Sequence, residues 1–372
     1  MKLLYIDKFC FLEESAIENF IYTLANRIKD KCETTILVSN NRRRTRVENI
    51  RGINIIRMAR LFGTDSSTFS PTLPLWMRRV KSDVIHFNVI NLFIIISYLL
   101  ARPKAKTVCF YSFDTDRKRF SFYRPLLIRF FKRVDKIVVS DQSLLENSEV
   151  LKGFQEKCEV IPCGIDVKKF DKLADIEQKV CDFNERYGYD LIIYTGDLVR
   201  HKGVDYLIEA MKDVDAKLLV LGDGPMRKKW KALAKKSGVS EKVIFLGNLP
   251  PYELRAYLHS SIMLVLPSLK PSIDFEMIHL GAFACRIPVV STDLGSGIAA
   301  MNRDRETGFV VPPRDSKALS EAINTLLKNE KLRLEFAENA RQRVEKHYNL
   351  EYISSRMVNL YERLAEKGSQ SV

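Results

Sequence analysis

The sequence is poor in proline and glycine for a chain of 372 residues. Its seven cysteines form no C-x-x-C pair and are odd in number, which argues against a zinc site and against a disulfide framework. Only 13 prolines and 16 glycines are present, so the composition is that of a globular protein rather than of a disordered or fibrous one. We therefore expect a packed core and a reducing compartment.

Long hydrophobic runs are missing as well. The longest, residues 89–101, is interrupted by polar side chains and falls short of the roughly 20 residues that cross a bilayer. It predicts a buried helix. The first residues, Lys2–Asp7, resemble a strand and lack the longer apolar region and the cleavage site of a signal peptide. These features predict a cytoplasmic protein and leave association with a membrane surface open.

Positive charge, in contrast, is in excess. The formal net charge is +14, which favours anionic partners such as nucleotides, phospholipid head groups or nucleic acid. Part of the charge is clustered, in residues 42–46 and again in residues 117–133. For each cluster, the alternative to a binding site is an ordinary solvated basic face.

Short β-branched apolar runs alternate with longer helical patterns along the whole chain. This alternation predicts βαβ units with parallel sheets, and the length predicts two domains. One series of strands is expected at residues 2–7, 34–39, 53–58, 83–88, 106–111 and 136–140. A second series is expected at residues 190–196, 216–224, 242–247, 261–268, 288–293 and 308–313. Two Rossmann-like halves of similar size result.

A polar, charged segment over residues 166–189 separates the two series of strands. It predicts a linker followed by the first helix of the second domain. From Asp315 onward, apolar residues recur at helix spacing. We therefore expect a first domain over residues 1–165, a second over 166–345, and a helical segment over 346–372 that packs back on the first domain.

The second half carries a series of motifs, each at or near an expected strand. In chain order they are TGDLVRHKG (195–203), LGDGPMRKKW (221–230), FLGNLPPYEL (245–254), LVLPS (264–268), GAFACRIPVV (281–290) and ETGFVVPP (306–313). This succession, preceded by VIPCGIDVKKF, resembles the donor-binding domain of glycosyltransferase family 4. The resemblance implies an α/β protein of the GT-B fold, in which two Rossmann-like domains face each other across a cleft.

Ligands of open parallel sheets bind beyond the carboxyl ends of the strands, so the loops after the strands are the expected site. The loop from Gly196 presents Arg200 and Lys202 beside a helix start, which suits a diphosphate. The resemblance places the family's phosphate-binding lysine at Lys202, with a solvated lysine as the alternative. It also implies donor contacts, largely through backbone groups, at Gly196, Gly222, Gly247, Asn248, Leu249, Phe275, Glu276 and Met277. For the glycines of the GDG turn, we expect a structural role in the turn before a role in binding.

Several positions depart from the family pattern. Asp197 stands where an arginine is usual, and its charge would repel a pyrophosphate. The two glutamates of the family correspond to Ile273 and Gly281. Asp274 and Glu276 are the nearest candidates for catalytic carboxylates. The alternative is that both stabilise the start of a helix by their charge.

The first half offers one further candidate for catalysis. His86 lies at the end of an expected strand, where an acid or base would be useful. The alternative is a buried histidine with its hydrogen bonds satisfied.

Residues 120–134, FSFYRPLLIRFFKRV, predict an amphipathic basic helix. Such a helix could make peripheral contact with an anionic membrane. Alternatively, it packs its apolar face on a sheet and leaves a solvated basic back. Nucleic acid is not an expected partner, because no recognised nucleic-acid-binding module accompanies the charge.

The resemblance implies a glycosyltransferase that moves a sugar from a nucleoside diphosphate sugar to an unknown acceptor, which could be a glycan, a lipid or a lipid-linked sugar. It further implies retention at the anomeric carbon, no obligatory metal and no cofactor besides the donor substrate. The missing glutamates support an alternative from another class. This is a catalytically degenerate GT-B protein that binds another glycosyltransferase, a glycan or a membrane.

Overall fold

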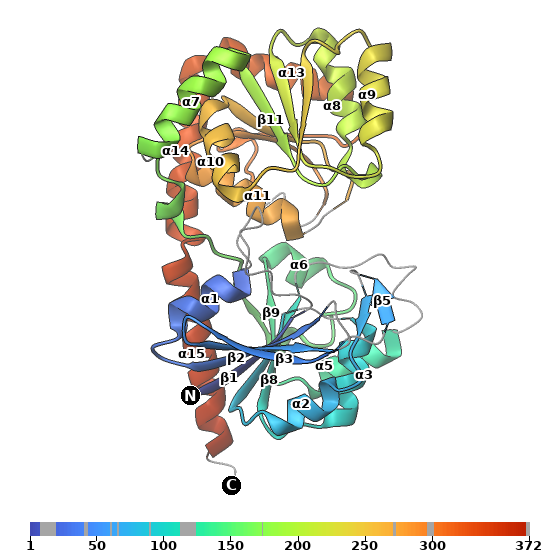
Figure 1. Ribbon diagram of the computed structural model, residues 1–372, viewed down its shortest axis with the longest axis vertical. Helices are drawn as coiled ribbons and strands as arrows, with labels where there is room; N and C mark the ends of the chain where they lie inside the picture. Colours follow the sequence, from blue (N-terminus) through green and yellow to red (C-terminus); the bar gives the residue numbers. More distant parts are fainter. Residues whose placement is uncertain are drawn as a thin grey trace. The chain divides into compact units, whose positions relative to one another are not determined.

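The computed structural model describes residues 1–7, 20–40, 44–59, 62–64, 67–88, 91–111, 124–172, 174–270, 273–295 and 301–369. The chain forms two compact units (Figure 1). The first holds the described residues up to Pro162 together with the chain from Glu351 onward, and the second holds residues 163–350.

The first unit is built on a sheet of eight described strands in the order β10-β9-β8-β7-β1-β2-β4-β3. Neighbouring strands run parallel except β3, which pairs antiparallel with β4. The strands are β1 Lys2–Ile6, β2 Glu33–Ser39, β3 Arg46–Ile50, β4 Ile53–Met58, β7 Val84–Phe87, β8 Lys106–Tyr111, β9 Lys136–Val139 and β10 Cys158–Val160. A separate pair, β5 Phe62–Thr64 and β6 Ser67–Phe69, forms a small ribbon.

Helices cover both faces of this sheet. Successive residues of a strand point to opposite faces, so Ile85 and Phe87 belong to one face and His86 to the other. The first of these faces packs against α2 Leu73–Arg79, α3 Leu92–Ala101 and α5 Arg124–Arg133 through one apolar cluster. His86 instead contacts α15 Leu350–Ser369. The remaining helices of the unit are α1 Phe20–Ile28, α6 Gln142–Asn147 and η1 Gln155–Lys157.

The second unit is built on six described parallel strands in the order β13-β12-β11-β14-β15-β16. They are β11 Leu191–Thr195, β12 Lys217–Leu221, β13 Val243–Gly247, β14 Met263–Leu266, β15 Val289–Thr292 and β16 Gly308–Val311. The helices are η2 Val167–Phe170, α7 Ala174–Tyr187, η3 Arg200–Lys202, α8 Val204–Ala210, η4 Met211–Asp213, α9 Arg227–Lys236, α10 Pro251–Ser260, α11 Ile273–Ala284, α13 Ser316–Lys328 and α14 Glu330–His347.

Every strand expected from the sequence is present, in two separate sheets as predicted. The strands are apolar runs because helices bury both faces of a parallel sheet. β3 was not expected, because it is an edge strand with the polar sequence RVENI and is largely exposed. β10 was missed because it is only three residues long.

The apolar run at residues 89–101 forms α3, but the prediction of a buried helix is only partly right. One face of α3 is buried through Ile94, Ile95 and Tyr98, whereas Leu100 on the other face is 63% exposed. Among the described helices, none combines the length and the apolar character needed to span a bilayer.

The last helix, α15, belongs to the first unit although it follows the second unit in sequence. The Arg356 guanidinium donates to the Val160 carbonyl at 2.7 Å, and Arg363 pairs with Glu159 at 2.8 Å. The chain thus leaves the first unit after β10 and returns to it with α15.

Candidate functional site at the strand ends of the second unit

The sheet of the second unit has one point where the direction of strand succession reverses. From β11 the chain adds β12 and β13 on one side, and β14, β15 and β16 follow on the other. In open parallel sheets, ligands bind beyond the carboxyl ends of the strands at such a switch point. The loops after β11 and β14 are therefore the expected walls of a site.

Backbone hydrogen bonds tie together the loops that follow β11, β12 and β13. The amide of Gly196 donates to the Leu221 carbonyl at 3.1 Å, and the amide of Gly222 donates to the Gly247 carbonyl at 2.7 Å. The amide of Leu198 donates to the Asp223 carbonyl at 2.9 Å. Three glycines predicted to bind the donor, at positions 196, 222 and 247, are thus brought together.

Close approach of the backbone explains the glycine at position 222. It has a φ of +122°, and a Cβ atom added there would lie 2.1 Å from the Gly196 carbonyl oxygen. Gly224 is similar, with a φ of +155° and an added Cβ 2.7 Å from the Leu198 oxygen. Only glycine fits these positions without strain, so both have a structural role whatever they bind.

The loop with the predicted phosphate ligands is fixed against the loop after β14. Gly203 has a φ of +67°, and an added Cβ would lie 2.0 Å from the Pro267 oxygen. The amide of Leu269 donates to the His201 carbonyl at 2.7 Å. Between these two contacts lies Lys202, which is only 4% exposed, whereas Arg200 is exposed. The switch point therefore places Lys202 in an environment largely shielded from water.

Two models of protein families match the chain. Glycosyltransferase Family 4 matches residues 17–169, and Glycosyl transferases group 1 matches residues 175–343. The O-antigen chain mannosyltransferase C of Escherichia coli is 30% identical over 319 residues, which cover 85% of each chain. The chain belongs to glycosyltransferase family 4. The D-rhamnosyltransferase WbpZ of Pseudomonas aeruginosa is 29% identical over 265 residues, or 71% of this chain and 69% of that one.

The fold has counterparts among solved structures. The structure of Anabaena Alr3699/HepE in complex with UDP-glucose superposes with a TM-score of 0.79 at 16% identity, covering 98% of this chain and all of the other. This glycosyltransferase therefore has the GT-B fold expected from its motifs. Nothing in the comparisons supports the alternative of a catalytically degenerate binding protein.

The two positions that the family resemblance assigns to its glutamates, Ile273 and Gly281, lie on α11 of this glycosyltransferase. A Cβ atom added at Gly281 would lie 3.3 Å from the ring of Phe170, so a longer side chain there would have to displace that ring. Ile273 is the first residue of α11. The side chains of residues 273–276 lie outside the described residues, and with them those of Asp274, Phe275 and Glu276. Met277 is described and is buried.

The acidic residue in the loop predicted to bind phosphate is exposed to solvent. Asp197 follows Gly196, and its backbone carbonyl accepts a hydrogen bond from the Tyr194 hydroxyl at 3.1 Å. The Asp197 side chain is exposed. Water and salt screen exposed charges strongly. Its repulsion toward a phosphate is thus weaker than that of a buried acid.

Arg227 is a candidate that the sequence motifs did not single out. Its guanidinium donates to the Asp223 carboxylate at 2.7 Å and lies 3.6 Å from the position of a Cβ added at Gly247. The backbone amide of Gly224 and then Arg227 lower the pKa of Asp223. The spacing of four residues between an acid and a base at a helix start could have revealed this pair. The ion pair with Asp223 holds the Arg227 cation beside the loop that contains Gly247, the exposed Asn248 and the half-buried Leu249.

His86 lies in the core of the first unit and is only 1% exposed. Its Nδ1 is 2.6 Å from the Tyr361 hydroxyl, which is 3.0 Å from the Tyr5 hydroxyl. Burial lowers the pKa of His86 to about 3. The burial matches the alternative to a catalytic role that the sequence offered, but the hydrogen bonds are not all satisfied, because Nε2 is buried without a partner among the described residues. His279, on α11, is also fully buried.

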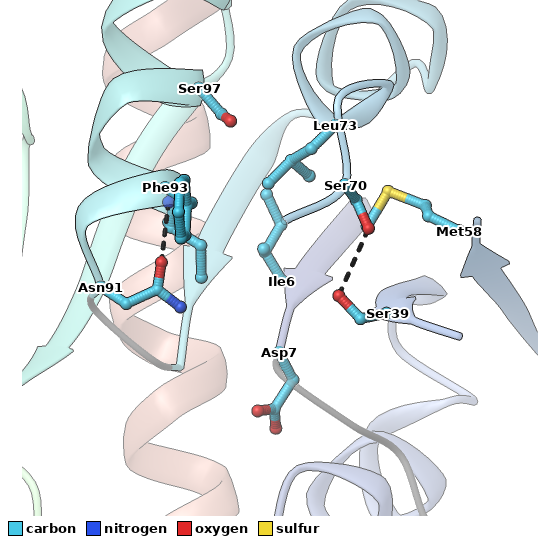
Figure 2. Close-up of a pocket in the computed structure, with 10 residues that line it drawn as sticks. Ile6, Asp7, Ser39, Met58, Ser70, Leu73, Asn91, Phe93 and Ser97 are labelled. Atoms are coloured by element: carbon cyan, nitrogen blue, oxygen red, sulfur yellow. Dashed lines mark hydrogen bonds between the residues drawn. The ribbon is translucent and has the colours of Figure 1, made fainter. Parts of the chain in front are cut away.

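A narrow hollow lies where β1, β2 and β4 of the first unit end (Figure 2). It is lined by Asp7, Ser39, Met58 and Ser70 among others, and Figure 2 shows Asn91 at one side, where its carboxamide caps α3. The space open to a water-sized molecule is about 10 Å³, roughly that of one water. Within the described residues, this hollow is too small for a sugar ring.

Proposed function

We propose that this glycosyltransferase transfers a sugar from a nucleoside diphosphate sugar to a glycan or lipid-linked acceptor. The observation that carries the proposal is the junction of the strand-end loops at the switch point, with Lys202 held inside it. A cation shielded from water attracts a diphosphate more strongly than an exposed one, because the effective dielectric constant is lower. The UDP-glucose in the structure of Alr3699/HepE supports a donor of this class.

The chemical step that we propose is departure of the diphosphate from the anomeric carbon. Lys202 and Arg200 would stabilise the charge that develops on the leaving group. Backbone N–H groups at the start of α11, which is twelve residues long, would add to this stabilisation. The loop of Gly247, Asn248 and Leu249 would hold the base, with Arg227 beside it. Retention at the anomeric carbon and independence of metal belong to the same proposal.

The nature of the sugar is proposed from the relatives. A mannosyltransferase of O-antigen chains and a D-rhamnosyltransferase are among them, which favours a hexose or deoxyhexose donor and a polysaccharide chain as acceptor. Consumption of the donor distinguishes a transferase from a protein that only binds it.

Transfer activity is expected to persist in the presence of a metal chelator. The anomeric configuration of the product, read by NMR, is expected to match that of the donor.

Calorimetric titration of the full chain with UDP, GDP and their sugar derivatives tests the donor site. We expect one of the two bases to bind, and Lys202→Ala to weaken that binding by on the order of 10- to 100-fold, the value of one charge-assisted hydrogen bond. Lys317→Ala is the matched control, because Lys317 is an exposed lysine of the same unit on α13. The nucleotide affinity of the Lys317→Ala variant should equal that of the wild type.

Each outcome has a distinct consequence. If no nucleotide binds at millimolar concentration, the proposed function is wrong. If a nucleotide binds and Lys202→Ala leaves its affinity unchanged while the variant unfolds at the wild-type temperature, the phosphate assignment is wrong and the transfer proposal stands.

A further inference from the structure

Three neighbouring helices of the first unit carry no acids, and cations lie on α2 and α5 and directly after α3. α2 packs against α3, and α3 packs against α5 (Figure 1). The sequence stretches that contain them, residues 71–82, 91–105 and 124–134, include no Asp or Glu. A solvated protein surface normally mixes charges of both signs. An excess of positive charge on these helices favours an anionic partner.

The same helices expose large aliphatic side chains. Leu75 on α2 is 65% exposed and Leu100 on α3 is 63% exposed. Ile96 is also exposed, and it lies one turn before Leu100 on the same face of α3. Arg78, one turn after Leu75, donates to the carbonyl oxygens of Leu100 at 3.2 Å and Ala101 at 2.6 Å. This contact joins the end of α2 to the end of α3.

Exposed cations accompany these apolar side chains on α2, on α5 and directly after α3. Arg79 lies over the ring of Trp76 on α2, and Arg133 of α5 lies over the ring of Tyr98 on α3. Further exposed cations follow α3 or lie on α5, namely Arg102, Lys104, Arg129 and Lys132. We call the exposed aliphatic and basic side chains of α2, α3 and α5, together with Arg102 and Lys104, the α2–α3–α5 face.

The apolar stripe of α5 is not available to a partner. Leu127, Phe130 and Phe131 are fully buried in the core of the first unit, so α5 presents only its basic back. Residues 120–123 of the predicted amphipathic helix lie outside the described residues. A lipid contact through α5 alone would therefore lack apolar anchors. Those anchors come from α2 and α3.

We propose that the α2–α3–α5 face docks on bilayers that contain anionic phospholipid. Aliphatic side chains enter the boundary between head groups and acyl chains, while Arg and Lys side chains bind the anionic head groups around them. Single-stranded nucleic acid would call for exposed aromatic rings on which bases stack, whereas the exposed apolar side chains on this face are Leu75, Ile96 and Leu100. The chemistry of the face thus favours lipid.

Co-sedimentation of the full chain with vesicles tests this proposal. We expect binding to vesicles of phosphatidylcholine and phosphatidylglycerol, little binding to phosphatidylcholine alone, and weakening by salt. Combined substitution of Arg129, Lys132 and Arg133 by Gln should lower the partition coefficient by on the order of 100-fold. The double variant Leu75→Ser and Leu100→Ser should lower it by at least about tenfold.

The matched control removes the same charge from another basic helix. Lys228, Lys229 and Lys236 are exposed on α9 of the second unit, and their combined substitution by Gln should leave vesicle binding close to the wild-type value. Variants are compared only where circular dichroism gives the wild-type melting temperature. The leucine and the charge variants provide two independent tests in case one of them fails to fold.

Three results would overturn the proposal. They are absence of binding to anionic vesicles, equal loss in the α9 control, and a charge variant that loses binding to an oligonucleotide but not to vesicles. The assay requires neither nucleotide nor acceptor. Its outcome is therefore independent of the proposed sugar transfer.

Discussion

At the scale of single residues, His86 illustrates how a side chain can depend on a part of the chain far away in sequence. Its hydrogen-bond partner Tyr361 lies 275 positions later, on α15. From the sequence alone, the histidine at the end of β7 could equally have faced solvent. Burial by α15 gives it the lowered pKa of about 3.

This pKa predicts how the stability of the first unit depends on pH. Between pH 6.5 and about 3, the unfolded chain binds a proton at His86 that the folded chain does not bind. The free energy of unfolding therefore falls as the pH is lowered through this window, by up to about 1.4 kcal/mol per pH unit. Urea unfolding at pH 7 and pH 5 measures the effect. In a Trp230→Phe background, Trp76 on α2 reports on the first unit alone.

The variant His86→Phe is the control for this measurement. It removes the titrating group, so its loss of stability between pH 7 and pH 5 should be smaller than that of the parent. Equal losses would show that His86 does not contribute. Above pH 6.5, where the histidine is neutral in both states, no pH dependence is expected from it.

The positions that make up the proposed donor site differ in how far the sequence points to them. Lys202 and the glycines at 196, 222 and 247 follow strands in recognisable motifs, and the structure brings their loops together. Arg227 was missed because its position beside Gly247 depends on a side-chain pair with Asp223. The sequence thus predicts which backbone loops meet better than it predicts the side-chain contacts between them.

At the scale of elements, burial explains which strands the sequence predicts. β11 and β14 are buried along their whole length and appear as uninterrupted apolar runs. β3 is an exposed edge strand and has no such run. Its first residue, Arg46, belongs to a basic cluster of the sequence, and the structure pairs it antiparallel with Arg57 of β4. Charged side chains on an edge strand discourage pairing with other chains.

The close packing of the turn between β12 and α9 allows the effect of one methyl group added at Gly222 to be predicted. Gly222→Ala places a Cβ atom against the Gly196 carbonyl at a φ of +122°. The backbone strain alone costs about 1–3 kcal/mol, and displacement of the loop after β11 should weaken nucleotide binding as well. Urea unfolding followed through Trp230, in a Trp76→Phe background, and calorimetric titration measure the two effects.

Gly238→Ala separates strain from steric clash. Gly238 follows α9 with a φ of +73°, and no atom lies within 4 Å of an added Cβ. This variant should lose stability through backbone strain but retain the nucleotide affinity of the wild type. If both alanine variants bind nucleotide equally well, the packing of Gly222 on Gly196 does not support the donor site.

At the scale of the whole molecule, each unit has its own sheet and its own core. The two series of strands predicted two Rossmann-like halves, and the structure has a separate sheet in each unit. The net charge of +14 predicted anionic partners. The proposals divide these partners between the units, with a nucleotide at the second sheet and lipid at the α2–α3–α5 face.

The central claim concerns where the nucleotide binds, and amide hydrogen exchange of the full chain tests it most directly. With saturating UDP or GDP, we expect slower exchange at residues 196–203, 222–226 and 247–249, because a bound nucleotide covers these loops. Exchange in β1, β2 and β7 of the first unit should change little. Protection confined to the first unit, or no protection in the three loops while calorimetry reports binding, would contradict the account.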